Sequence, residues 1–147
     1  MSEANMRETN RQVALKFIRA MGDNDPVAAA ECLALDAIAV ATGNSHFKGS
    51  RDARMMIDGI EAFKSLMPDG LSFTIHNAIA EGDKVAVECE GNATTVAGTR
   101  YCNKYVFFCT LRGGKITLVN EYFCTVLANE VLWPLAQNAA GLGETAG

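Results

Sequence analysis

The sequence predicts a single α+β domain in which helices come first and pack on one face of a strongly bent antiparallel sheet. Apolar residues in the first half of the chain recur with the period of a helix, and those in the second half alternate with the period of a strand. No linker, internal repeat or low-complexity segment divides the 147 residues. A chain of this length buries roughly 68–70% of its unfolded surface, which is enough for one substantial core.

The first half of the chain is predicted to form three helices and one strand. A helix begins after Asn10, a residue type that caps helix N-termini, and its apolar residues form one stripe. Asp25 followed by Pro26 starts a short Ala-rich helix, because aspartate caps and proline fits the first turn. A strand at 36–42 comes next, and then a helix over 50–67 whose apolar residues recur at spacings of three and four.

The second half predicts a four-stranded antiparallel meander, since apolar and polar residues alternate between short turn sequences. The turns are Glu81-Gly82-Asp83, a looser one near Gly98, and Arg112-Gly113-Gly114. The expected strands are 71–76, 85–90, 101–111 and 115–125. The core is expected to span about 10–133, with frayed tails at 1–9 and 135–147.

The composition is typical of a globular protein, with 49% hydrophobic and 20% charged residues. The net charge is −4 and there is no basic stripe, so we expect no nucleic-acid partner. We expect no membrane association either, because no apolar run approaches the ~18–20 residues of a spanning helix. The polar N-terminus lacks a secretion signal, which favours a cytoplasmic location. The five cysteines contain no C-x-x-C pair and predict neither a disulfide framework nor a zinc site.

The final predicted hairpin carries a family resemblance. The run from Tyr101 to Thr125, YCNKYVFFCTLRGGKITLVNEYFCT, resembles the SnoaL-like signature, in which Y-x-N-x-Y-x-F, (D/G)-G-K-I and E-Y-x-D-T follow one another. SnoaL-like proteins are grouped with ketosteroid isomerases, polyketide cyclases and limonene epoxide hydrolases as nuclear transport factor 2-like proteins. The resemblance implies a cone-shaped, cystatin-like α+β barrel, in which N-terminal helices pack on the concave face of the bent antiparallel sheet.

The sequence departs from these enzymes at their catalytic positions. Cys124 stands where the family usually has Asp. In the epoxide hydrolases an Arg and a second Asp occupy the positions of Glu88 and Glu90. Ala41 and Phe17 lie near the positions of the general base and the oxyanion-hole tyrosine of ketosteroid isomerase. We therefore do not expect steroid isomerisation by that apparatus.

Two glutamates are the first candidates for catalysis. Glu88 and Glu90 are two residues apart on a strand, so their side chains project from the same face. Alternation with Val85, Val87 and Cys89 predicts that the glutamates face water. The resemblance implies instead that they face the concave side, where burial and mutual repulsion raise the pKa of at least one carboxyl. They would then form an acid/base pair, with Glu90 in the family's catalytic position.

Other candidate residues lie on the next strand, where Lys104 marks the outer face and so places Tyr101, Asn103, Tyr105 and Phe107 inward. Asn103 and Tyr105 would then orient a carbonyl or enolate oxygen, or else pack and hydrogen-bond within the sheet. His46 would lie in a loop at the mouth of the cone as a base or oxygen ligand, or be solvated. Alternation places Tyr122 and Cys124 on the inward face with Ile116. The expected pocket residues are Phe17, Met21, Met56, Phe63, Asn92, Tyr101, Tyr122 and Cys124.

These residues predict a cofactor-free and metal-free enzyme that transfers protons on a small hydrophobic, oxygenated molecule in a conical pocket. Isomerisation, cyclisation and dehydration all fit such an acid/base site. The alternative is a non-catalytic ligand-binding or scaffold domain of the same fold, which Cys124 in place of Asp favours. We also expect a homodimer through the outer face of the sheet, because its apolar positions need a cover.

Overall fold

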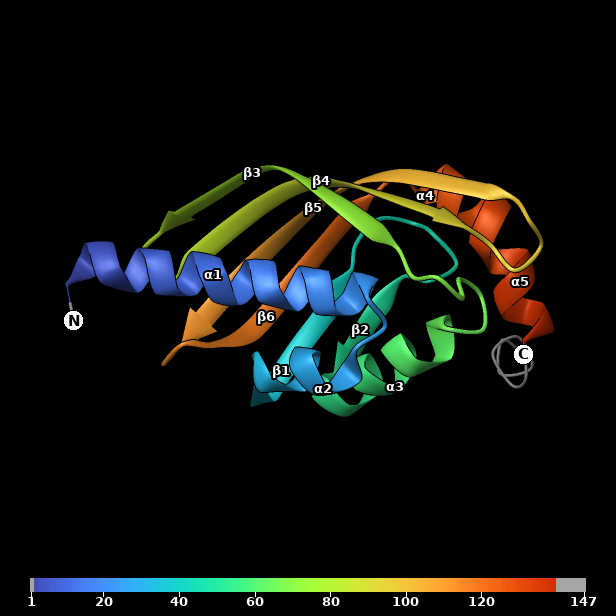
Figure 1. Ribbon diagram of the computed structural model, residues 1–147. Coiled ribbons are helices and arrows are strands. Elements are labelled where there is room, and N and C mark those ends of the chain that lie inside the picture. The colour runs from blue at the N-terminus through green and yellow to red at the C-terminus, as the bar shows by residue number, and fades with distance from the viewer. Residues whose placement is uncertain (1, 140–147) are drawn as a thin grey trace.

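A curved six-stranded sheet wraps around the N-terminal helix in the computed structural model, which describes residues 2–139 (Figure 1). The strand order is β2-β1-β6-β5-β4-β3. Strand β1 runs parallel to β6, and all other neighbours are antiparallel. The sheet stays open, with β2 and β3 at its edges. The predicted α+β class, with a bent sheet and helices on its concave side, is confirmed.

The strands are β1 (Leu33–Ala41), β2 (Gly49–Asp52), β3 (Ser72–Glu81), β4 (Lys84–Thr94), β5 (Arg100–Arg112) and β6 (Lys115–Phe123). The helices are α1 (Glu3–Gly22), α2 (Pro26–Glu31), α3 (Ala53–Phe63), α4 (Thr125–Leu127), the π-helix η1 (Ala128–Leu132) and α5 (Trp133–Asn138). In Figure 1 α1 lies under the sheet, and the C-terminal helices lie at one end of it. None of the helices within residues 2–139 is both long and apolar enough to cross a bilayer.

Helix α1 begins earlier than the sequence predicts. The Ser2 side chain accepts a hydrogen bond from the backbone N–H of Asn5 and so caps the helix at Glu3. Asn10 is a buried residue inside this helix, so the predicted cap at Asn10 is wrong, as is the predicted fraying of residues 3–9. At the other end, α5 continues to Asn138, and the rest of the predicted tail lies outside the described residues.

Strand β2 replaces the start of the predicted third helix. It pairs with β1, with Arg51 opposite Ala39, and this pairing satisfies the backbone of residues 49–52. Asp52 then caps α3 by accepting a hydrogen bond from the N–H of Met55 at 2.9 Å. The helix is therefore shorter than the predicted 50–67, and Arg51 lies in the edge strand just before the capping residue of this helix.

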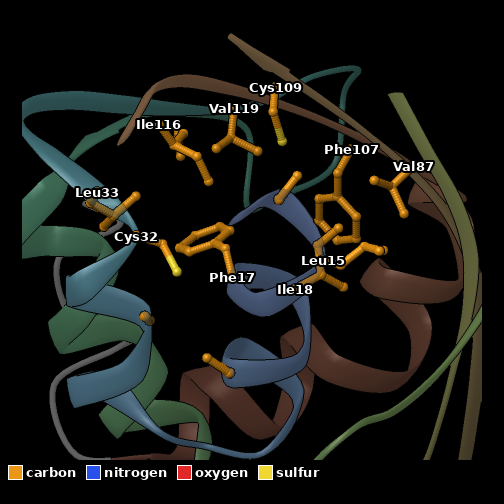
Figure 2. Close-up of a cluster of buried hydrophobic side chains, with 14 of the residues drawn as sticks. Leu15, Phe17, Ile18, Cys32, Leu33, Val87, Phe107, Cys109, Ile116 and Val119 are labelled. Atoms are coloured by element: carbon orange, nitrogen blue, oxygen red, sulfur yellow. The ribbon is translucent and has the colours of Figure 1, made fainter. Parts of the chain in front are cut away.

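The core lies between α1 and the concave face of the sheet (Figure 2). Phe17 and Ile18 of α1 pack against side chains from β4, β5 and β6, and both are essentially inaccessible to solvent. Each large apolar side chain buried in this way contributes about 1.5–3 kcal/mol. The residues labelled in the figure are Leu15, Phe17, Ile18, Cys32, Leu33, Val87, Phe107, Cys109, Ile116 and Val119.

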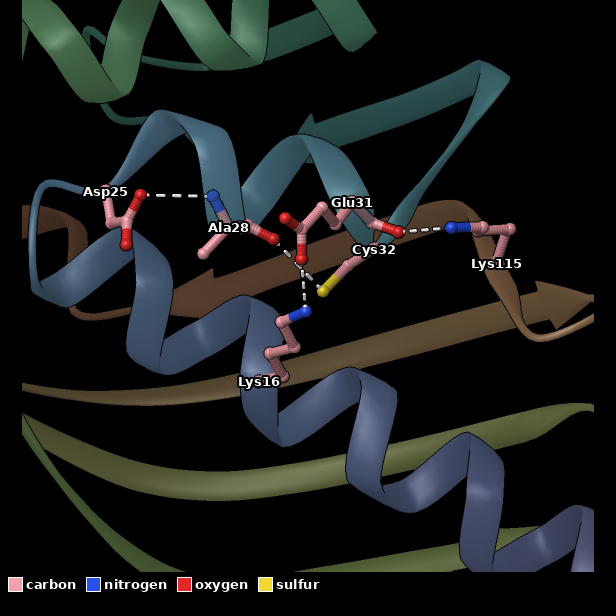
Figure 3. A network of polar contacts seen from close by, with 6 residues as sticks. All are labelled: Lys16, Asp25, Ala28, Glu31, Cys32 and Lys115. Atoms are coloured by element: carbon pink, nitrogen blue, oxygen red, sulfur yellow. Dashed lines mark hydrogen bonds and ion pairs between the residues drawn. The ribbon is translucent and has the colours of Figure 1, made fainter.

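Polar contacts tie helix α2 to its neighbours (Figure 3). Asp25 caps α2 by accepting from the N–H of Ala28 at 3.0 Å. Lys16 of α1 contacts the Glu31 carboxylate at 2.6 Å, and Lys115 of β6 donates to the Glu31 backbone carbonyl. Cations near a helix C-terminus are favourable because they meet its unpaired carbonyl groups. These contacts hold the helical layer against the start of β6.

A bulge in β6 changes which of its side chains face the core. Leu111 of β5 pairs with Ile116, and Thr110 pairs with Leu118, which leaves Thr117 as an extra residue. One extra residue inverts the alternation of every side chain beyond it. The pairing between β1 and β6 also shifts in register at this point, between Ile116 and Leu118 of β6. Beyond Thr117, the side chains of β6 that face the core are therefore those that uninterrupted alternation predicts to face away from it.

Candidate functional site

An apolar cavity of about 180 Å³ lies between the concave face of the sheet, α3 and η1. Its wall is rich in methionine and aromatic side chains, which suit an apolar ligand of irregular shape. Those side chains are Met21, Met55, Met56, Met67, Phe47, Phe63, Phe73, Tyr101, Tyr105, Phe107 and Phe123. Met55, which is 52% exposed, marks the open side of the cavity.

Glu121 and Arg51 bring charge into this apolar wall. Glu121 lies opposite Phe107 on the concave face, because the bulge at Thr117 has turned it inward. Arg51 Nη2 lies 3.5 Å from Glu121 Oε2, and the Glu121 side chain is only 18% exposed. Burial raises the pKa of Glu121 above its ordinary value of 4.5, and the positive charge of Arg51 offsets part of this rise. The cavity thus holds a carboxyl group that exchanges its proton closer to neutral pH than an exposed glutamate does.

Two tyrosine hydroxyls form a second polar group in the cavity. The hydroxyl oxygens of Tyr101 and Tyr105 are 2.7 Å apart, and Asn103 Nδ2 donates to Tyr101 Oη at 2.8 Å. Asn103 also donates to the Cys124 carbonyl, and its Oδ1 accepts from the backbone N–H groups of Cys124 and Lys104. Both amide protons and the carbonyl oxygen of Asn103 are therefore engaged within the protein, so Asn103 positions Tyr101.

Glu88 and Glu90 lie on the outer face of the sheet, so the prediction that they share the concave side is wrong. Asn77 Nδ2 donates to Glu88 Oε1 at 2.7 Å, at the surface. Cys102 Sγ donates a hydrogen bond to Glu90 Oε1 at 3.2 Å, and His76 Nε2 lies 3.6 Å from Glu90 Oε2. The hydrogen bond from Cys102 and the contact with His76, in that order of size, lower the pKa of Glu90. Uninterrupted alternation on β4 is the physical reason, because it buries Val85, Val87 and Cys89.

Three further residues predicted for the pocket also face away from it. Tyr122 is 48% exposed, and Cys124 is exposed at the start of α4, because the bulge at Thr117 reverses their orientation. Asn92 lies on the outer face of β4, where it alternates with the buried residues on either side of it. These positions correct the predicted inward orientation of all three.

Phe17 and His46 do not line the cavity either. Phe17 is 1% exposed within the core under the sheet, and it does not line the cavity. His46 is exposed and stacks on Trp133, with ring centroids 5.1 Å apart, so the following residue, Phe47, reaches the cavity in its place. The ring of His46 packs against the C-terminal helix, which the sequence pattern alone does not reveal.

Of the residues singled out from the sequence, the structure brings Met21, Met56, Phe63, Tyr101 and Tyr105 together around the cavity. Sequence reasoning missed Glu121 and Arg51. The sequence does contain one signal for the orientation of Glu121. Leu118 and Val119 are adjacent apolar residues, which breaks the alternation of β6 and indicates that the core-facing positions shift by one residue. No comparable signal marks Arg51, because β2 has the polar sequence Gly-Ser-Arg-Asp.

Solved structures share this fold at low sequence identity. PrhC from Penicillium brasilianum NBRC 6234 is 19% identical with a TM-score of 0.81, over 94% of this chain and 96% of that one. An NTF2-like protein from Burkholderia xenovorans LB400 is 20% identical with a TM-score of 0.67, over 85% and 96%. A protein with a ketosteroid isomerase-like fold from Catenulispora acidiphila DSM 44928, in complex with trimethylamine, is 19% identical with a TM-score of 0.67, over 80% and 90%. Identities this low support the fold alone.

Sequence comparison goes further than the fold. No curated protein matches the chain. The family model of the SnoaL-like domain, however, matches residues 14–119, which run from α1 into the inward-turned part of β6. The match covers most of the chain and agrees with the resemblance seen in the final hairpin. This protein therefore belongs to the SnoaL-like domain family.

Proposed function

We propose that this SnoaL-like protein is a cofactor-free enzyme that moves a proton on a small apolar, oxygenated molecule bound in the cavity. The observation that carries this proposal is the Glu121 carboxyl group, set in an apolar wall with a raised pKa. A carboxyl group of this kind serves both as a base and as an acid near neutral pH. Arg51, 3.5 Å away, supplies N–H donors to an oxygen that gains negative charge.

Proton transfer at a carbon next to a carbonyl group fits these two side chains. The Glu121 carboxylate accepts the proton, and the electron pair of the broken C–H bond forms an enolate whose oxygen faces Arg51. Isomerisation follows when Glu121 returns the proton to a different carbon. Cyclisation follows when the enolate carbon attacks a second carbonyl group, whose oxygen becomes an alkoxide and takes the proton back from Glu121. Dehydration follows when the enolate expels hydroxide, which leaves as water with the proton of Glu121. All three reactions share the first step.

The proposal is tested with cyclohex-3-enone, whose ring fits the cavity. Removal of a proton from C2 and its return at C4 gives cyclohex-2-enone, and the conjugated product is followed by its ultraviolet absorbance. We expect the protein to accelerate this isomerisation at a rate that saturates with ketone concentration. Failure to accelerate the reaction contradicts the proposal. Saturable binding of the ketone without turnover supports the alternative, a non-catalytic ligand-binding domain of the same fold.

We also propose that the outer face of the sheet joins two copies of the chain in a homodimer. Four apolar side chains on this face have exposed fractions between 37% and 68%: Ile38, Ile79, Phe108 and Tyr122. They come from β1, β3, β5 and β6, and cross-strand pairs such as Phe108 with Asn120 and Val106 with Tyr122 connect them. A second copy of the same face covers such a surface in a symmetric way.

The homodimer is tested with Phe108→Asp, which places a charge in the middle of the apolar face. We expect the wild-type protein to sediment as a dimer at micromolar concentration and the variant to sediment as a monomer, because the interface cannot pair the buried charge. Val27→Asp, at an exposed position of α2, serves as the control and is expected to remain dimeric. A monomeric wild-type protein contradicts the proposal.

A further inference from the structure

The tyrosine pair leaves one hydroxyl proton without a partner among residues 2–139. Tyr101 Oη already accepts a hydrogen bond from Asn103 Nδ2. The contact of 2.7 Å between the hydroxyls of Tyr101 and Tyr105 uses one of their two protons, whichever of them donates. Burial raises the pKa of both tyrosines, so both hydroxyls stay protonated at neutral pH. The second proton therefore remains available to a ligand in the cavity.

This pair lies apart from the charged pair in the same cavity. Tyr105 is opposite Phe123, and Glu121 is opposite Phe107, so Tyr105 and Glu121 are diagonal neighbours on β5 and β6. Within residues 2–139, the hydrogen bonds of the tyrosine hydroxyls go to each other and to Asn103, and none joins them to Glu121 or Arg51. The wall around them is apolar, formed largely by methionine and phenylalanine side chains. A ligand thus meets two separate polar points, one at Arg51 and Glu121 and one at the tyrosine pair.

The size of the cavity limits what can reach both points. A cavity of roughly 150 Å³ in another protein holds one benzene molecule. The cavity of about 180 Å³ has room for one substituted ring, whereas a skeleton of four fused rings could enter only in part and would project through the open side at Met55. The ligand that uses both polar points is therefore compact.

We propose that the tyrosine pair is a second oxygen-binding site in the cavity, and that the ligand is a single-ring apolar molecule with two oxygen functions at opposite ends. One oxygen binds at Arg51 and Glu121, and the other accepts a hydrogen bond from the tyrosine pair. Asn103 acts as a positioning residue that fixes Tyr101. The inference rests on the proposed use of the cavity as a ligand site, and it does not require that Glu121 transfers a proton.

Two probes that differ by one hydroxyl group test this site. Acetophenone carries one oxygen, and 4-hydroxyacetophenone carries a second across the ring. We expect 4-hydroxyacetophenone to bind about tenfold more tightly by calorimetry, which is the gain from one hydrogen bond in an apolar site. Removing both hydroxyls, in the double variant Tyr101→Phe/Tyr105→Phe, is expected to bring the two affinities close together, because either hydroxyl alone could still donate to the ligand. The matched control Tyr122→Phe, on the outer face, is expected to keep the tenfold preference.

Several results overturn the inference. These are equal affinities of the wild-type protein for the two probes, binding of neither probe, and a tenfold preference that persists in the folded double variant Tyr101→Phe/Tyr105→Phe. Estrone, which carries two oxygens at the ends of a four-ring skeleton, tests the size limit, and its binding as tightly as 4-hydroxyacetophenone overturns that limit. Because these are binding measurements, an inactive enzyme in the cyclohex-3-enone assay contradicts the proposed function and leaves this site standing.

Discussion

Replacing Glu121 with Gln is expected to lower kcat/KM for cyclohex-3-enone by about 100-fold or more, because a general acid/base group contributes roughly 10²–10⁴ to the rate. The glutamine side chain introduced by Glu121→Gln keeps the size of the original and can still meet Arg51, but it cannot take up and return a proton. The apolar wall of the cavity is unchanged in this variant. The loss is therefore expected in kcat, with KM nearly constant, and is measured by absorbance of the conjugated product.

The matched control is Glu90→Gln, the same chemical change on the outer face of the sheet. Glu90 contacts Cys102 and His76 there and does not line the cavity, so the variant is expected to keep the wild-type rate. A rate that falls in Glu90→Gln and survives in Glu121→Gln contradicts our assignment. It would support the acid/base pair that the family resemblance implies.

Stability measurements show whether Glu121→Gln remains folded. The pKa of Glu121 is raised in the folded state, so the stability that its protonated form contributes is present below the ordinary value of 4.5 and is lost as the pH rises through the folded pKa. Glutamine carries no charge at any pH. We therefore expect the variant to have a larger free energy of unfolding than the wild-type protein at neutral pH. The difference is expected to vanish below pH 4.5, as measured by urea denaturation.

Gly22→Ala is expected to lower the free energy of unfolding by about 3 kcal/mol, which is typical of overpacking a tight junction. A Cβ at position 22 would lie 2.2 Å from the carbonyl oxygen of Leu71 and 2.9 Å from the ring of Phe73. Leu71 N–H also donates to the Gly22 carbonyl at 2.8 Å, so the two backbones cannot separate without losing this bond. The loss is measured by urea denaturation. Met21 and Leu71, which line the cavity, adjoin this junction.

Gly59→Ala provides the matched control within α3. A Cβ at this position meets no atom within 4 Å. Alanine forms helices better than glycine by up to about 1 kcal/mol, so the variant is expected to be as stable as the wild-type protein or more so. Equal losses in the two variants would contradict the explanation by close backbone contact and would point to a general intolerance of added side chains.

The sequence was sufficient wherever its periodicity runs without interruption. On β5, alternation correctly places Tyr101, Asn103 and Phe107 inward, and on β4 it correctly places Val87 inward and Glu88 outward. On β4 the family resemblance implied the opposite, and the alternation of the chain itself was the better guide. The buried stripe of α1 is likewise visible in the sequence, since an apolar face of a helix must pack against something.

The periodicity of the sequence does not predict short polar elements or contacts between distant segments. Strand β2 has no apolar pattern, and it forms because the free edge of β1 pairs with its backbone. Its pairing brings Arg51 beside Glu121 across 70 positions of the chain. The stacking of His46 on Trp133 is a similar case, because the two rings belong to distant segments that only the folded chain brings together.

The sequence by itself determined the SnoaL-like fold, the three N-terminal helices followed by a four-stranded meander, and the methionine and aromatic residues available to line a cavity. Only the tertiary structure decided which carboxyl group enters that cavity. The extra residue at Thr117 turns Glu121 inward and Tyr122 outward, and the partners that accommodate it lie on β5 and β1. Since strand side chains alternate with a period of two, one such residue reverses every position beyond it, and its location depends on pairing between strands rather than on local sequence.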